Sequence, residues 1–233
     1  MNAESSEHGL ERDNNMDVFD IIGPIMIGPS SSHTAGAVKL GNVARILLGS
    51  EPVKAIITLY GSFAKTGKGH GTDKALLAGI CGYTMDDARI RTIYDECPFE
   101  YEFRFNDNWE YHPNTAVIEL TDGNMSVKMR GASVGAGRIE VQEVDDMTVS
   151  FNGDFNTLII FHYDRKGIIG KITTWLSENG VNIAFMRVFR LEKDEKAVMV
   201  IETDQKVDNY KDLESFQEGL RVEYYENTHV NTF

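Results

Sequence analysis

The C-terminal third of the chain has a periodicity that leaves few folds open to it. Residues 157–163 contain a strand-sized apolar run and are expected to form a strand, and apolar residues then recur at helical spacing up to Asn179-Gly180, which ends the predicted helix. A strand hairpin, a second helix and a last strand follow in the remaining segments, which are 181–191, 197–203, 213–220 and 221–225. The order βαββαβ is the ferredoxin-like split βαβ arrangement.

The larger N-terminal part combines both periods, and we expect an α+β fold in which a mixed α/β-sheet domain over 17–150 precedes the βαββαβ domain at 156–233. The first domain is expected to contain helices at 37–48 and 72–80 and strands at 53–60, 101–105, 116–120, 126–130 and 138–144. A linker at 151–154 separates the two domains. Residues 1–16 are polar and are expected to form a disordered tail.

Composition and charge exclude two classes of partner. The chain of 233 residues has 23 Lys and Arg against 36 Asp and Glu, a formal charge of −13, so the basic surface that nucleic acid attracts is missing. No apolar stretch approaches the roughly 20 residues that cross a bilayer. The acidic N-terminus also lacks the apolar core of a signal peptide. We expect a cytoplasmic protein with no nucleic-acid and no membrane partner.

The two cysteines, Cys81 and Cys97, limit the metal chemistry of the chain. Without an export signal they are expected to be free thiols in a reducing compartment. An iron-sulfur cluster is held mostly by three or four thiolates. The sequence therefore predicts no metal site and no cluster bound by this chain alone.

Four hydroxyls and an imidazole crowd the expected start of the first helix, in the motif Gly28-Pro-Ser-Ser-Ser-His-Thr34. One serine would be enough to cap the helix. The surplus donors, with the free N–H groups of the first turn, indicate a pocket for a carboxylate or a phosphate. A serine-rich capping loop with an exposed His33 is the simpler alternative.

A glycine-rich segment, Gly61-Ser-Phe-Ala-Lys-Thr-Gly-Lys-Gly-His-Gly-Thr-Asp-Lys74, follows a strand and precedes a helix. Its spacing does not match a Walker phosphate loop. We expect a flexible loop in which two glycines flank His70, beside Lys65 and the pair Thr72-Asp73. An imidazole presented in this way is a candidate for proton transfer near neutral pH. A mobile surface loop without function is the alternative.

Two further segments are candidates. His112-Pro-Asn-Thr115 can bring an imidazole, an amide and a hydroxyl together before a strand, although a simple turn also uses Pro-Asn. The segment Gly131-Ala-Ser-Val-Gly-Ala-Gly137 lacks the order of a dinucleotide-binding loop. We interpret it as a bend or a backbone turn that faces a ligand.

The βαββαβ segment resembles an ACT domain, a module that usually binds amino acids, through Asp164-Arg-Lys-Gly-Ile-Ile-Gly170 and Gly180-Val-Asn-Ile183. The turn before the helix offers backbone N–H groups to a ligand carboxylate. The family often has Pro where Lys166 stands. The resemblance implies an effector site, formed by Asp164, Arg165, Gly167, Ile168, Asn182 and Ile183. Packing or homodimer formation without a ligand is the alternative.

Together, the motifs at 22–36, 61–73 and 112–115 and the ACT-like segment resemble the beta subunits of iron-sulfur-dependent L-serine dehydratases. The resemblance covers residues 17–233. It implies an allosteric-substrate-binding-like N-terminal domain and conversion of L-serine to pyruvate and ammonia. It also implies a separate alpha subunit that carries a [4Fe-4S] cluster.

By the same resemblance, His33 and His70 would act in binding or proton transfer, and the residues do not decide which imidazole is the base. The substrate would contact a second set of side chains. These are Ser30, Ser31, Ser32, Thr34, Lys65, Thr72, Asp73, His112 and Asn114.

Two other functions are open from the residues. A regulatory amino-acid-binding protein would need only the ACT-like segment. A hydrolase using Ser32 and His33 would need no iron, but adjacent residues on one turn seldom form a productive nucleophile and base pair.

Overall fold

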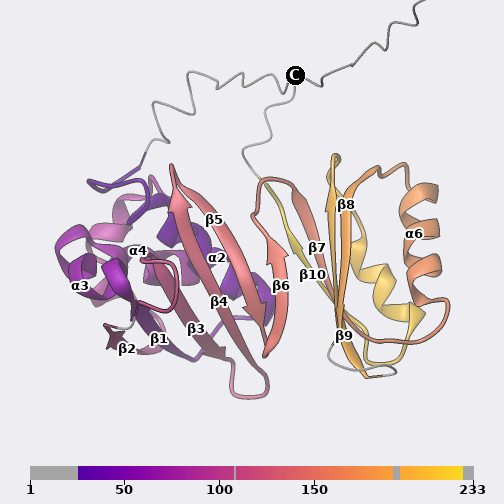
Figure 1. The fold of residues 1–233 in the computed structure, drawn as a ribbon, viewed down its shortest axis with the longest axis horizontal. Coiled ribbons are helices and arrows are strands. Elements are labelled where there is room, and N and C mark those ends of the chain that lie inside the picture. The colour runs from indigo at the N-terminus through magenta and orange to yellow at the C-terminus, as the bar shows by residue number, and fades with distance from the viewer. Residues whose placement is uncertain (1–25, 108, 191–194, 228–233) are drawn as a thin grey trace, which may run out of the picture.

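The computed structural model describes residues 26–107, 109–190 and 195–227, which form two β-sheets with their helices (Figure 1). The two sheets lie side by side, and α6 covers the side of the second sheet that faces away from the first (Figure 1). The expected α+β architecture, with a mixed sheet followed by a βαββαβ unit, is confirmed.

The first sheet has six strands in the order β2-β1-β3-β4-β5-β6. Strands β1 and β2 are parallel, and the other pairs are antiparallel. The elements of this part are α2 (Ala35–Leu48), β1 (Lys54–Tyr60), α3 (Gly61–His70), α4 (Thr72–Ile80), η1 (Ala88–Arg91), α5 (Ile93–Glu96), β2 (Glu100–Asn106), β3 (Thr115–Thr121), β4 (Ser126–Gly135), β5 (Arg138–Val144) and β6 (Met147–Phe151). The segment Thr121-Asp-Gly-Asn124, whose sequence predicts a hairpin turn between strands 116–120 and 126–130, joins β3 to β4.

The second sheet has four strands in the order β10-β7-β9-β8, all in antiparallel pairs. Its elements are β7 (Asn156–Tyr163), α6 (Ile168–Glu178), β8 (Ile183–Arg190), β9 (Lys196–Thr203), η2 (Tyr210–Phe216) and β10 (Arg221–Tyr225). This is the predicted order, except that a 3-10 helix takes the place of the second α-helix.

Strands β7 and β9 of the second sheet contribute to two cores, since successive side chains of a strand point to opposite sides. Ile159 and Val200 belong to the core of the first domain. Their neighbours Ile160 and Met199 belong to a second core that α6 and η2 cover. The core of the first domain therefore extends to one face of the second sheet, and the second core lies on the other face.

Helices α2 and α4 cross at two glycines. A Cβ atom added at Gly41 would lie 2.4 Å from the carbonyl oxygen of Leu76, and one added at Gly79 would lie 2.1 Å from that of Val38. The helix backbones therefore approach more closely than any other residue would allow. This crossing fixes α2 in place.

The expected flexible loop before residue 72 is wrong, because residues 61–70 form helix α3. Phe63 is fully buried, and its backbone N–H donates to the carbonyl of Pro113 at 3.1 Å. Burial of an aromatic side chain stabilises the fold by more than the low helix propensity of a glycine costs. Gly71, at φ 74°, then separates α3 from α4.

Two further expectations differ from the structure. Most of the segment 131–137 continues strand β4, with irregular pairing to β5, and the turn is confined to its end. Strand β6 occupies residues 147–151, where the sequence suggests only the approach to a linker. None of the helices in the described ranges is long and apolar enough to cross a membrane.

Candidate functional site

The turn at residues 30–34 leads directly into α2. Thr34 is the N-cap residue, but its side chain makes no capping hydrogen bond. The backbone closes the turn instead, with Thr34 N–H donating to Ser30 at 2.8 Å and Gly36 N–H donating to Ser31 at 3.0 Å. Ser30, Ser31 and Ser32 are half-buried. The Ser30 hydroxyl accepts from the backbone N–H of His33 at 3.4 Å, as a capping serine would, but His33 is 8% exposed, contrary to the exposed imidazole of the capping-loop alternative.

His33 is held by hydrogen bonds at both ring nitrogens. Its Nε2 atom lies 3.1 Å from the hydroxyl of Thr66, and its Nδ1 atom lies 3.3 Å from the hydroxyl of Ser30. The Thr66 hydroxyl donates to the carbonyl of Ser62 at 2.9 Å, so it accepts from Nε2–H of His33. Nδ1 then accepts from Ser30. These contacts favour one tautomer of His33.

His70 lies against His33, with ring centroids 4.7 Å apart and an angle of 89° between the ring planes. His33 is 8% exposed, whereas His70 is exposed. Burial, and then the neighbouring His70, lower the pKa of His33, which keeps its ring neutral. Within the described part of the chain, His70 has no hydrogen-bond partner at its ring nitrogens. We call Ser30, His33, Thr66 and His70 the imidazole cluster.

Sequence reasoning missed Thr66 and Ser62. Both lie in the glycine-rich motif, but a loop gives no reason to single them out. In α3, Ser62, Thr66 and His70 follow one another at a spacing of four residues and so share one helix face. That spacing of four residues could have indicated a helix, but the many glycines of the motif favoured a loop instead.

The segment 112–114 lies next to both helix starts. Pro113 accepts from α3, and Asn114 accepts from the N–H of Ser133 at 3.0 Å and donates to its carbonyl at 3.4 Å. Ser133 lies against Gly36 in the first turn of α2, where an added Cβ would be 2.1 Å from its hydroxyl oxygen. His112 is exposed, and its Nδ1 accepts from Asn114 N–H at 3.2 Å. The structure thus brings three predicted motifs together.

Other predicted substrate residues have contacts elsewhere. Lys65 is exposed and its ammonium lies 4.9 Å from the ring centroid of Trp109. Asp73 is 4% exposed and accepts hydrogen bonds from the Tyr94 hydroxyl and the backbone of Lys74. Thr72 is fully buried, and its hydroxyl has no partner among the described residues. Among the described residues, no hydrogen bond or ion pair joins these three side chains to the imidazole cluster.

The predicted effector residues form two groups in one chain. Asp164, Arg165, Gly167 and Ile168 lie at the junction of β7 and α6, where Asp164 accepts from Arg190 at 2.5 Å and Gly167 has φ 88°. Asn182 and Ile183 lie at the start of β8. Because β7 and β8 run parallel, the two groups are at opposite ends of the sheet, roughly 25 Å apart at 3.3 Å per residue.

Both cysteines are half-buried free thiols. Burial raises the pKa of Cys81 to about 12, with a further contribution from Cys97, and burial also raises the pKa of Cys97. A metal ligand must be a thiolate. Across the described ranges, no group of three or more His, Cys, Asp or Glu side chains is placed to hold a metal ion.

Two family models match parts of this chain. Residues 17–98 match the family described as "Serine dehydratase beta chain", and residues 156–209 match the ACT domain. The chain is similar to D-3-phosphoglycerate dehydrogenase of Bacillus subtilis (strain 168), at 23% identity over 74% of this chain and 34% of that protein.

Two beta chains are more similar. Identity is 42% to the "Probable L-serine dehydratase, beta chain" of Bacillus subtilis (strain 168), over 83% of this chain and 89% of that protein. It is 34% to the "L-serine dehydratase, beta chain" of Peptoniphilus asaccharolyticus, over 80% of this chain and 86% of that protein. The chain therefore belongs to the family of L-serine dehydratase beta chains.

Proposed function

We propose that this chain forms one half of an L-serine ammonia-lyase active site and that an alpha subunit supplies the other half. The observation that carries this proposal is the pair of imidazoles, 4.7 Å apart, beside a serine-rich turn at a helix start. Adjacent imidazoles and hydroxyls can bind a small polar substrate and move a proton.

The reaction is an elimination followed by hydrolysis. A base removes the Cα proton of L-serine, and the 3-hydroxyl leaves with a proton as water, which gives 2-aminoacrylate. This product tautomerises to an imine, and water converts the imine to pyruvate and ammonia. The Cα proton is weakly acidic and hydroxide is a poor leaving group, so the site needs both a base and an electrophile.

We assign proton transfer to His70 and positioning to His33. Both ring nitrogens of His33 are occupied by Ser30 and Thr66, whereas His70 is exposed. The lowered pKa of His33 limits the positive charge beside His70. The turn residues Ser31, Ser32 and Thr34, with Asn114, are the proposed carboxylate-binding groups, since anions are favoured at helix N-termini.

The electrophile is assigned to the partner. When bound there, a [4Fe-4S] cluster with an open iron would act as a Lewis acid on the 3-hydroxyl of the substrate. This chain has two cysteines, fewer than the three or four thiolates that mostly hold such a cluster. Free thiols and an oxygen-sensitive cluster both suit a reducing cytoplasm.

Anaerobic co-expression with subunits that carry cluster cysteines, followed by a pyruvate assay with L-serine, tests the proposal. Activity should require both chains. His70→Ala should lower kcat by about 10²- to 10⁴-fold, the usual contribution of a general base. Ser32→Ala should raise KM, whereas the matched change Ser177→Ala on exposed α6 should leave both constants unchanged. Full activity of His70→Ala would refute the assignment.

The ACT match supports amino-acid binding as a second candidate function. A purely regulatory protein would bind an amino acid at Asp164 and Arg165 and would support full turnover by its partner after His70→Ala. Pairing of two copies through the second sheet would bring its two effector groups closer together than one chain does. Light scattering of the purified chain, with and without amino acids, tests that pairing.

A further inference from the structure

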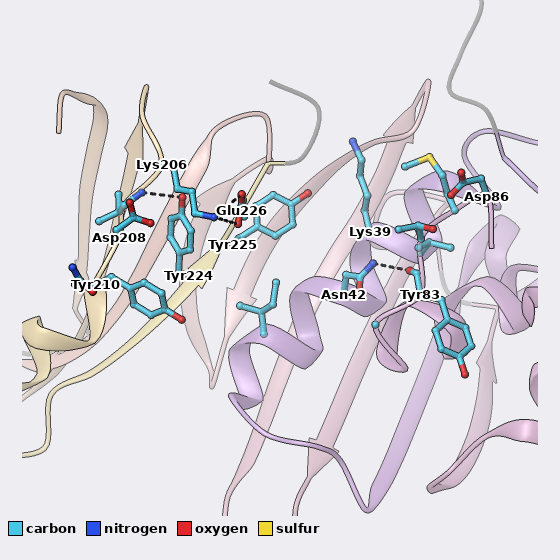
Figure 2. Close-up of a pocket in the computed structure, with 17 residues that line it drawn as sticks. Lys39, Asn42, Tyr83, Asp86, Lys206, Asp208, Tyr210, Tyr224, Tyr225 and Glu226 are labelled. Atoms are coloured by element: carbon cyan, nitrogen blue, oxygen red, sulfur yellow. Dashed lines mark hydrogen bonds and ion pairs between the residues drawn. The ribbon is translucent and has the colours of Figure 1, made fainter. Parts of the chain in front are cut away.

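A cleft of about 830 Å³ lies between the two domains, and we call it the interdomain cleft (Figure 2). Helix α2 and the segment 82–86 form one wall. The segment 206–210 and the end of β10 form the other wall. This volume is within the range of about 300 to 1,000 Å³ typical of small-molecule sites, which often occur at domain interfaces.

Hydrogen bonds stabilise each wall of the cleft, and another hydrogen bond connects the two domains beside it. Asn42 donates to the carbonyl of Tyr83 at 3.2 Å on the α2 wall, and Val207 N–H donates to the Tyr224 hydroxyl at 3.1 Å on the opposite wall (Figure 2). Arg221 of β10 donates to the carbonyl of Leu47 at the end of α2, at 2.6 Å. The cleft is therefore preformed, and a ligand would not need to order its walls.

The α2 wall carries two charged side chains, the half-buried Lys39 and the exposed Asp86. Lys39 is half-buried, and burial lowers its pKa while Asp154 opposes that change. Within the described ranges, neither Lys39 nor Asp86 makes a hydrogen bond or an ion pair. Asp154 acts on Lys39 without a direct ion pair between them, so a ligand carboxylate in contact with this half-buried ammonium would stabilise it further. Figure 2 shows Lys39 and Asp86 on the same wall, where they can bind opposite charges of one ligand.

The opposite wall is aromatic, and its Lys206 ammonium is already paired. Lys206 forms an ion pair with Glu226 at 2.9 Å. The rings of Tyr210 and Tyr224 lie 5.1 Å apart, and Tyr225 is 7% exposed. In Figure 2 the Tyr225 ring extends from β10 toward the Lys39 wall. This wall suits an apolar side chain.

We propose that the interdomain cleft binds an L-amino acid with a large apolar side chain, with its carboxylate on Lys39, its ammonium on Asp86 and its side chain against the tyrosine wall. The site is separate from the β7–α6 turn with Asp164 and Arg165. Lys39 lies in α2, and α2 directly follows the serine-rich turn that contains His33. A ligand bound to Lys39 would therefore contact the helix next to that turn. Binding does not depend on the proposed lyase function.

Isothermal titration of the purified full chain, without any partner, tests this proposal with L-phenylalanine and L-leucine. Both should bind, whereas L-phenylalaninamide and 3-phenylpropionate, which each lack one charge, should bind at least tenfold more weakly. Lys39→Met and Asp86→Asn should each raise Kd at least tenfold, which corresponds to about 1.4 kcal/mol. Circular dichroism of each variant checks that it is folded.

Two control variants distinguish binding in the interdomain cleft from binding at the β7–α6 turn. Asp208→Asn removes an exposed carboxylate from the opposite wall and should leave Kd unchanged. Arg165→Ala alters the β7–α6 turn and should also leave it unchanged. Loss of binding in Arg165→Ala with normal binding in Lys39→Met would overturn the proposal, as would the absence of saturable binding by either amino acid. Neither result would bear on turnover of L-serine.

Discussion

The hydroxyl of Thr66 is the contact that fixes the orientation of His33, and Thr66→Val removes it with little change in shape. In the parent chain, Nε2 of His33 lies 3.1 Å from the hydroxyl oxygen of Thr66. Valine keeps the β-branched shape of threonine but has no acceptor for this N–H group. His33 is 8% exposed, so its N–H group loses most of its access to water. The substitution therefore leaves a largely buried donor without a partner.

The expected cost follows from this burial. An unsatisfied buried donor costs about 1 to 3 kcal/mol. Thr66 itself is exposed, so water can replace part of the lost contact, and we expect the lower end, about 1 kcal/mol. That corresponds to about a fivefold change in an equilibrium constant. The tautomer preference of His33 should weaken as well, because only Ser30 would then favour it.

Two measurements check this prediction. Hydrogen exchange of the α2 amides should report the loss of stability near the turn. Nitrogen chemical shifts of the His33 ring should show a mixture of tautomers in Thr66→Val and one dominant tautomer in the parent chain. Thr66→Ser keeps the hydroxyl and is the matched control. Unchanged exchange together with an unchanged tautomer in Thr66→Val would refute the hydrogen-bond assignment.

Two further predictions concern packing and pH. Gly41→Ala should lower the unfolding free energy by about 1 to 3 kcal/mol in urea denaturation, because its Cβ would lie 2.4 Å from the carbonyl of Leu76. Gly69→Ala meets no atom within 4 Å and should raise it by about 0.5 to 1 kcal/mol; a loss there would contradict the helical assignment of α3. Burial raises the pKa of Glu202, although Arg187 opposes this, so its contribution to stability is present at low pH and is lost as pH rises through the raised pKa. Glu202→Gln should remove that part of the pH dependence of the unfolding free energy, and an unchanged profile would show that Glu202 does not titrate in this way.

Local patterns were sufficient for much of the fold. The period-2 and helical patterns of residues 157–225 depend on neighbours along the chain, so the βαββαβ order could be predicted without knowledge of any partner. Helix α2 and the hairpin at 121–124 were predicted for the same reason. Helix α3 was not, because its glycines argue against a helix and only the burial of Phe63 in the tertiary structure outweighs them.

The sequence by itself determined which chemical groups the site contains, since the serine-rich turn and the flanked imidazole stand out as motifs. The tertiary structure decided how they meet. His33 and His70 come together because α2 and α3 pack on the same sheet. Thr66 lies on the same face of α3 as His70 and hydrogen-bonds to His33, and a loop would not have placed it there. Packing also places the Asp73 carboxylate where it accepts a hydrogen bond from the Tyr94 hydroxyl, and not beside the two imidazoles. Contacts between distant segments depend on packing, and periodicity carries no information about them.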